Sequence, residues 1–434
     1  MPISPRSKRI LTVTAASVIL VGSILLAVIP LLLERWLNQY DLQSAFHQAT
    51  GGSISAGAFE LRVFPAPHLI VPAGKMNLPE LASGSWQEIK IHPAFKALLS
   101  GQIRFRKIRI QRPDIQLRPT SRPQMHGQTK VAWGRLQTEH LRQRLGEAFR
   151  KMNGLLQWLM THSPEARVRI RNGRLNWDET LGDTAPIFHD VDANLTLPPE
   201  ALLIELDCKS SLMRALRLTG HLDAGAQGGE LTFWFKDVDA EKISTAVGLA
   251  RPANRIAGLL SGHMSLNLKG PESIESHIAF RLPRLLLQRL DKPLIVQSLF
   301  VDGNLTIDAT KIKLELDRLY AQQPRLNITG HAQAGGGVPG LRIHLVGSQI
   351  DVAEARRATL ALIGDSEQAV AIFDVLRAGN VPWISWRTEG ISIGDLGVFR
   401  NMKLTGEMES GELYIPAADL PLTDVSGIAD IVDG

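Results

Sequence analysis

The run His189-Asp190-Val191-Asp192 is the part of the sequence that most resembles a metal-binding cluster. In a strand, however, neighbouring residues point to opposite faces, so His189 and Asp190 are not expected to share one ion. The spacing also matches neither a zinc-binding motif nor a calcium-binding loop. We therefore expect solvated turn residues here, no metal site and no cofactor.

Catalytic motifs are missing from the sequence, which has no G-x-S-x-G, P-loop or H-E-x-x-H pattern. The run Gly390-Ile-Ser-Ile-Gly394 resembles a dinucleotide-binding turn, but no buried strand precedes it and no clean crossover helix follows. The single cysteine, Cys208, excludes an internal disulfide and a cysteine-based zinc site. We expect a protein that is not an enzyme, and an enzyme such as a hydrolase is the least favoured hypothesis.

The charge of the chain is mildly basic, with a formal net charge of +5. Most of the local surplus lies at Arg6, Lys8 and Arg9 and in the stretch from Arg104 to Arg122. This distribution is too diffuse for nucleic-acid binding, which needs a concentrated basic face interleaved with stacking aromatic residues. We therefore expect no nucleic-acid partner.

The remaining chemical feature is distributed along the chain, as aliphatic residues on one face of many expected strands. The segment Lys311–Asp317 shows it most clearly, because four charged residues alternate with three aliphatic ones. Such two-faced strands argue against a parallel α/β sheet, whose strands are apolar on both faces. The pattern predicts an apolar groove with ten candidate lining residues, namely Leu195, Leu197, Leu202, Ile204, Leu206, Leu266, Leu268, Ile312, Leu314 and Leu316.

A short glycine frame, apolar-x-Gly-x-apolar, recurs as punctuation between these expected strands. Glycine in a strand usually marks a bulge or a bend, and the irregular spacing predicts a duplicated meander rather than a strict solenoid. Because the last frame opens only a few residues before Gly434, we expect either a longer natural chain or a short member of its class. The frames centre on Gly220, Gly262, Gly303, Gly330, Gly406 and Gly427.

The first element that the sequence predicts, before any of these strands, is a membrane anchor. From Ile10 to Leu33 no residue is charged, and this run exceeds the roughly 20 apolar residues that cross a bilayer as a helix. No small-x-small cleavage site follows it, so we expect a retained anchor rather than a signal peptide. Basic residues precede the span, which predicts a cytoplasmic tail (residues 1–9), a single inner-membrane span (residues 10–33) and a body outside the cytoplasm.

The body divides into three expected regions. Residues 34–117 form a β unit that opens with a short helix, Trp36 to Thr50, ended by the glycine pair after it. Residues 118–162 comprise a polar loop and an amphipathic helix. Residues 163–434 form repeated β-groove units.

Three segments have helical rather than alternating periodicity. Two of them, Asp239–Leu249 and Val352–Ala378, lie among the expected strands. The third, Glu139–His162, is basic and amphipathic, and it either caps the sheet or lies on anionic lipid headgroups. Capping is the favoured role, because core-facing amphipathic helices are common.

One stretch carries a family resemblance. A Thr-Gly pair at Thr50 is followed by the run Leu98-Leu-Ser-Gly-Gln-Ile-Arg-Phe-Arg-Lys-Ile-Arg-Ile110 and then by Pro113-Asp-Ile-Gln-Leu117. This order resembles the N-terminal region of the AsmA family of bacterial envelope proteins, with its pattern LLSGxIxxxxIxIxxPxIxL. Arg169–Asp178 looks like the strand and turn that open the next β unit of that family.

The resemblance implies an inner-membrane anchor, a periplasmic body of curved antiparallel sheet with an apolar concave face, and a role in outer-membrane assembly or phospholipid movement between the membranes. It brings no catalytic residues. Together with the strand pattern it predicts a mainly β fold with one N-terminal transmembrane helix, in which a curved antiparallel sheet forms an apolar groove with a few capping helices. The implied partners are phospholipid, the inner membrane and outer-membrane or other envelope proteins.

Two functions agree with these expectations. The leading hypothesis is a lipid-handling protein whose groove shelters acyl chains, since each buried methylene contributes about 0.8 kcal/mol. The alternative is a structural scaffold for outer-membrane protein assembly, in which the apolar rows pack against the protein itself as a closed core. The expected helices are too few to cover so much sheet, which favours the lipid hypothesis.

Overall fold

The computed structural model describes most of the chain from Gly51 onward. Within these residues no helix is both long and apolar enough to cross a bilayer, and the expected anchor at residues 10–33 lies outside them. The described residues are 51–57, 60–62, 68–79, 82–94, 104–117, 165–177, 187–223, 228–246, 254–270, 273–289, 292–308, 310–335, 340–363, 367–391 and 395–432, with Ser44, His47 and Met160.

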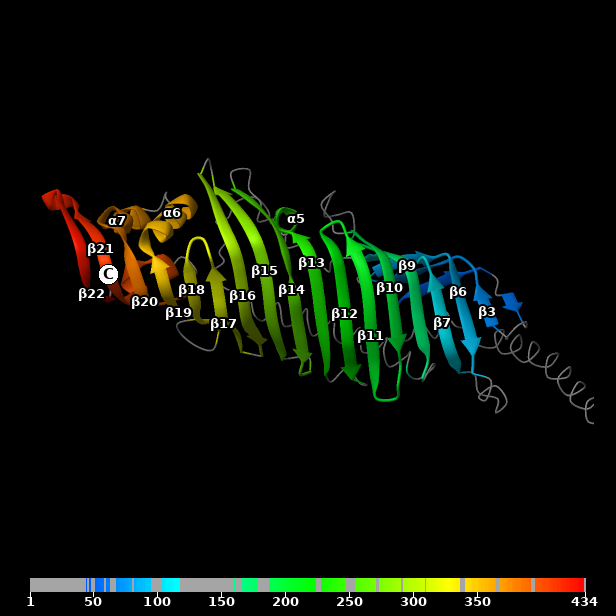
Figure 1. The fold of residues 1–434 in the computed structure, drawn as a ribbon. Helices are drawn as coiled ribbons and strands as arrows, with labels where there is room; N and C mark the ends of the chain where they lie inside the picture. Colours follow the sequence, from blue (N-terminus) through cyan, green and yellow to red (C-terminus); the bar gives the residue numbers. More distant parts are fainter. Residues whose placement is uncertain are drawn as a thin grey trace, which may run out of the picture.

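The described chain is mainly β, and its strands form one large, curved and unclosed sheet (Figure 1). From β9 onward each strand pairs antiparallel with the next, which confirms the predicted antiparallel meander. The strands of this meander are β9 (Arg167–Trp177), β10 (Ile187–Thr196), β11 (Ala201–Ser210), β12 (Met213–Asp223), β13 (Gly229–Asp239), β14 (Asn254–Leu268), β15 (Ile274–Arg289), β16 (Lys292–Ile307), β17 (Lys311–Ala321), β18 (Leu326–Gly335), β19 (Leu341–Asp351), β20 (Leu376–Gly390), β21 (Met402–Ile415) and β22 (Leu420–Val432).

Eight shorter strands precede β9 and form two branches of the sheet. The first half of β9 pairs parallel with β7, and its second half pairs parallel with β8. One branch continues from β7 to β6, β3 and β2, and the other from β8 to β5, β4 and β1. These strands are β1 (Ser53–Ala56), β2 (Glu60–Arg62), β3 (His68–Val71), β4 (Gly74–Leu78), β5 (Ala82–Trp86), β6 (Glu88–Pro93), β7 (Phe105–Gln111) and β8 (Asp114–Leu117).

The branches separate at Arg112 and Pro113, inside the run that resembles the AsmA pattern. Arg112 has the left-handed φ of 46°, and its N–H donates to the Arg171 carbonyl oxygen at 2.9 Å. The Pro113 carbonyl oxygen accepts from the Arg174 N–H at 2.7 Å. The chain therefore turns into the second branch while both halves stay paired to β9.

The two branches enclose a small hydrophobic core. Leu69 and Val71 from one branch and Trp86 from the other are buried together, with partly buried aliphatic residues of both branches around them. The Trp86 indole Nε1–H donates to the Pro72 carbonyl oxygen at 3.0 Å, which satisfies the one polar group of this side chain. Ile110 of β7 packs against this core and against the neighbouring core around β9 and β10, so the apolar interior continues into the long sheet.

Among the described residues the α-helices are few and lie along one end of the strands (Figure 1). The segment predicted at 239–249 forms α5 (Ala240–Ala246), and the segment predicted at 352–378 forms α6 (Val352–Ile363) and α7 (Glu367–Val375). The prediction was wrong for residues 376–378, which begin β20. Glu354 at the start of α6 donates its N–H to the Asp351 carboxylate at 2.8 Å, so an aspartate caps this helix.

The glycine frames lie in the interior of strands rather than between them. They occur in β12, β14, β16, β18, β21 and β22. Gly220 and Gly330 have φ near +150°, and a Cβ atom on either would overlap with a carbonyl oxygen of the adjacent strand. Glycine is therefore needed where neighbouring strands of the curved sheet approach most closely.

Candidate functional site: the two faces of the sheet

The pairing registers bring the aliphatic residues of the meander into continuous cross-strand rows. Directly opposite residues share a face of a sheet, so a chain of opposite pairs traces one face. We call this face the apolar face and define it by two rows. The first row is Val168, Leu195, Ile204, Gly220, Leu231, Leu266, Ser276, Leu305, Leu314, Ala332, Ile343, Thr388 and Met402.

The second row of the apolar face lies beside the first and has no polar member. It extends from β9 to β22 and alternates large side chains with glycine in its central part. Its residues are Ile170, Ala193, Leu206, Leu218, Phe233, Met264, Ile278, Gly303, Leu316, Gly330, Leu345, Trp386, Leu404 and Ile431.

The opposite face of the same strands is polar. We call it the polar face, and its central row contains no apolar residue between β9 and β21. Because one face is apolar and the other polar over so many strands, a register slip of one residue would reverse both faces. This row is Arg169, Asn194, Glu205, Thr219, Thr232, Ser265, His277, Asn304, Glu315, His331, His344, Arg387 and Lys403.

The apolar face is only half covered. Most of its large side chains are partly exposed, and Leu314 exposes 42% of its surface. Full burial on this face occurs in two clusters, Ala166, Val168 and Leu197 near β9 and Leu222 with Leu268 on β12 and β14, and Met160 packs against both. Met160 is the one described residue of the helix expected at Glu139–His162, and its position agrees with capping at this point. Beyond β14 the large side chains of the rows are only partly buried, so the described residues do not enclose them as in an ordinary sandwich.

Nine of the ten predicted groove residues lie in register on the apolar face. Leu195, Ile204, Leu266 and Leu314 belong to its first row, Leu206 and Leu316 to its second, and Leu202, Leu268 and Ile312 to a parallel row beside Leu222, Ile274 and Ile307. The exception is Leu197, which follows the end of β10 and is 1% exposed in the core. Its position makes it a packing residue rather than part of an open surface.

Two polar residues interrupt the first row, and both are buried. Thr388 donates its hydroxyl hydrogen to the Leu396 carbonyl oxygen at 3.0 Å. The Ser276 hydroxyl lies between Leu266 and Leu305 and has no hydrogen-bond partner. Because both hydroxyl-bearing residues are buried, the surface that the described residues of the two rows expose is mainly hydrocarbon.

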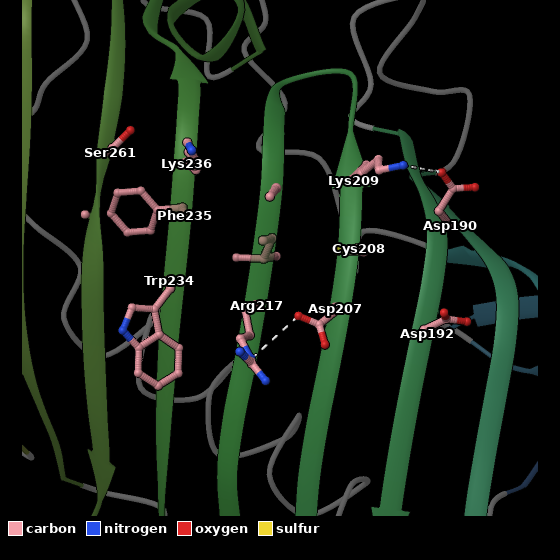
Figure 2. A pocket seen from close by; sticks show the side chains of 13 residues that line it. Asp190, Asp192, Asp207, Cys208, Lys209, Arg217, Trp234, Phe235, Lys236 and Ser261 are labelled. Carbon is pink, nitrogen blue, oxygen red and sulfur yellow. Dashed lines mark hydrogen bonds and ion pairs between the residues drawn. The ribbon is translucent and has the colours of Figure 1, made fainter.

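A cavity of about 530 Å³ lies between β10 and β14. Figure 2 shows that its carboxylates face cations of adjacent strands: Asp207 lies 3.6 Å from Arg217, and Asp190 lies 3.1 Å from Lys209. Its third carboxylate, Asp192, pairs with a β9 arginine at 3.0 Å. Each of the three lining carboxylates is therefore paired with a cation of a neighbouring strand.

The prediction for His189 and Asp190 was wrong in its geometry. Asp190 has a left-handed φ of 52° at a bulge in β10, which breaks the alternation of faces. As a result its carboxylate approaches the His189 ring at 3.4 Å, and it also pairs with Lys209. The Lys209 hydrogen bond, followed by that of His189, lowers the pKa of Asp190. Both residues lie within a strand rather than in a turn.

Cys208 is the one cysteine and lies on the same side of β11 as Leu206 and Ile204. Burial, with the nearby Asp207 carboxylate, raises the pKa of its thiol to about 11. The thiolate is the nucleophilic form of cysteine, so the native thiol is unsuited to covalent catalysis at neutral pH.

Sequence reasoning missed one polar cluster, formed by His277, Asp302 and Asp317 on the polar face. These residues lie on three adjacent strands and are far apart in sequence. Only the registers bring them together, and no local spacing indicates it.

These observations define the protein as a long amphipathic β sheet with one half-open apolar face. Comparison with protein-family models, curated proteins and solved structures finds no match to the chain.

Proposed function

We propose that the chain is a membrane-anchored, periplasmic, AsmA-like protein that moves phospholipid between the inner and outer membranes and so supports outer-membrane biogenesis. Its acyl-chain site is the apolar face. The observation that carries the proposal is the continuity of the apolar rows from β9 to β22 while their side chains stay partly exposed. Monomeric proteins rarely leave such a large apolar surface without a ligand or a partner.

The chemistry of the face suits acyl chains better than a defined small molecule. A specific site combines apolar walls with a few placed polar groups, whereas the two polar members of the first row are buried. Each acyl methylene that leaves water contributes about 0.8 kcal/mol. The affinity for an acyl chain can therefore come from the number of methylenes in contact with the apolar face. Such a chain can also move along the rows without breaking a hydrogen bond.

The proposal also depends on the end of the sheet near the expected anchor. The core of the two N-terminal branches and the core around β9 share Ile110, so apolar surface continues from β3 and β5 into the meander. A span at residues 10–33 would hold this end at the inner membrane, within reach of its lipid.

The test is lipid retention by the full-length protein after detergent removal, measured by native mass spectrometry. Changing Leu314 and Leu316 to Glu places two charges on the apolar face, and we expect bound phospholipid to fall at least tenfold while the circular dichroism of the sheet is kept. The matched control is Leu203→Glu: Leu203 exposes 46% of its surface but pairs with His221 on the polar face. Absence of lipid from the unsubstituted protein, or equal losses in both variants, would contradict the proposal.

A further inference from the structure

The polar face carries a cluster that the proposed lipid function does not use. His277 of β15, Asp302 of β16 and Asp317 of β17 each place one ligand atom within 4.8 Å of the others. Within the described part of the chain this is the one group of three such side chains. His277 and Asp302 are half-buried and Asp317 is exposed, so the cluster is open to solvent on one side.

Hydrogen bonds around the cluster indicate which nitrogen of the neutral His277 ring carries the hydrogen. The Asn304 Nδ2 donates to the Asp317 carboxylate at 2.6 Å, because a carboxylate can only accept. This orients the amide, whose oxygen faces the His277 Nδ1 at 3.2 Å and accepts its hydrogen. The other ring nitrogen, Nε2, therefore carries a lone pair.

That lone pair faces a second acceptor. The Asp302 Oδ1 lies 3.5 Å from the His277 Nε2, and this oxygen is buried without any hydrogen-bond donor. Two acceptors so placed repel each other unless a cation or an added proton lies between them. Burying a carboxylate oxygen without a hydrogen bond costs more free energy than burying a neutral polar group in the same way. The arrangement of His277 and Asp302 is therefore unfavourable unless a cation or a proton lies between the two atoms.

We propose that His277, Asp302 and Asp317 bind a divalent transition-metal ion, with zinc as the ion that suits them best. Zinc accepts imidazole and carboxylate ligands at about 2.0–2.2 Å, so two tetrahedral ligand atoms lie roughly 3.4 Å apart. The Nε2 to Oδ1 separation of 3.5 Å agrees with this value. Asn304 acts as a positioning residue, since metal-bound histidines commonly donate their other N–H to an oxygen acceptor.

The site would join three strands on the polar face. β15, β16 and β17 are consecutive in the meander, and β16 and β17 are shifted in register beside Asp302. A metal ion here would hold this irregular part of the sheet together from the side opposite the apolar rows. The inference does not depend on lipid binding.

The test uses the full-length protein in detergent, stripped of metal with a chelator and titrated with Zn²⁺ against a chromophoric competitor. We expect one high-affinity Zn²⁺ per chain, no competition from excess Mg²⁺, and a higher thermal midpoint when zinc is bound. Asp302→Asn and, at the exposed ligand, Asp317→Asn are each expected to weaken zinc binding at least 100-fold. Asn304→Ala is expected to weaken it about 10- to 100-fold.

The matched control is Asp223→Asn. Asp223 also pairs with a histidine, His221, at 3.7 Å, but this pair belongs to no group of three ligands among the described residues. Zinc affinity of this variant should equal that of the unsubstituted protein. The proposal is overturned if the unsubstituted protein binds no stoichiometric zinc, or if Asp317→Asn, which alters an exposed side chain and leaves the fold intact by circular dichroism, binds zinc as tightly as Asp223→Asn.

Discussion

At Gly220 the close approach of two strands leaves no room for a side chain. Its φ is 152°, and a Cβ atom there would overlap with the Glu230 carbonyl oxygen of β13. We predict that Gly220→Ala lowers the free energy of unfolding by about 1–3 kcal/mol, because either the backbone or the strand pair must shift. Chemical denaturation followed by circular dichroism measures this change.

The control for that substitution is another glycine of the same sequence frame. Nothing lies within 4 Å of a Cβ atom on Gly427 in β22, so Gly427→Ala should change stability by no more than about 0.5 kcal/mol. Equal effects of the two substitutions would show that the strand contact at Gly220 is not the cause.

The Cys208 thiol gives a prediction about pH. Burial raises its pKa to about 11, and only the thiolate reacts with alkylating reagents. The folded protein at pH 8 should therefore be alkylated at least 100-fold more slowly than the urea-unfolded chain, and its rate should climb as the pH rises toward 11. Mass spectrometry of timed iodoacetamide reactions measures both rates. Similar rates in the two states would mean that the thiol is accessible and its pKa ordinary.

Among the elements, the N-terminal branches depend on one aromatic side chain. Trp86 belongs to the branch of β5, yet it packs against β3 residues of the other branch. Trp86→Ala should cost about 3–5 kcal/mol of stability, since it leaves a cavity between the branches. Trp86→Phe keeps most of the volume and loses the hydrogen bond to Pro72, so it should cost about 1 kcal/mol. Thermal unfolding compares them, and equal midpoints would argue against a shared core.

The strands that sequence could predict are those with one open face. From Ile204 to Cys208 in β11 and from Lys311 to Asp317 in β17 the polar and apolar residues alternate, so the period of two was visible. β15 was not predicted, because its apolar positions are interrupted by Ser276 and its end contains the uninterrupted run Leu285 to Leu287. The parallel pairing of β7 with β9 could not be foreseen either, since it joins Lys107 to Arg167 across a long intervening segment.

The same distinction applies to the two candidate sites. The apolar residues were predictable because a side-chain period of two assigns each one to a face, whatever the neighbouring strand is. The prediction was wrong for Leu197, which is buried in the core. This residue follows the end of β10, where the alternation of a strand no longer determines which face a side chain lies on. The histidine and aspartate cluster depends on registers between β15, β16 and β17, which no local pattern specifies.

At the scale of the whole molecule, the long sheet presents a hydrocarbon surface on one side and a polar surface on the other. Fourteen strands, β9 to β22, at roughly 4.8 Å spacing give a contour on the order of 60 Å. This is about twice the hydrocarbon thickness of a bilayer. A surface of this length suits chains that move along it better than a ligand that stays in one pocket.

The scaffold hypothesis predicts a different contact for the apolar face. If the rows served only to pack against protein, the apolar face would be in contact with a polypeptide along the meander in the cell. In both hypotheses Leu314 and Leu316 are buried in the cell. The lipid hypothesis buries them against acyl chains, whereas the scaffold hypothesis buries them against polypeptide.

Site-specific photo-crosslinking in intact cells with labelled phospholipid therefore tests the lipid account most directly. A photoreactive residue in place of Leu314, on the apolar face, is compared with one in place of Leu203, on the polar face. The account predicts abundant lipid adducts at Leu314 and at most background at Leu203. Protein adducts without lipid at Leu314, or equal lipid labelling at both positions, would contradict it.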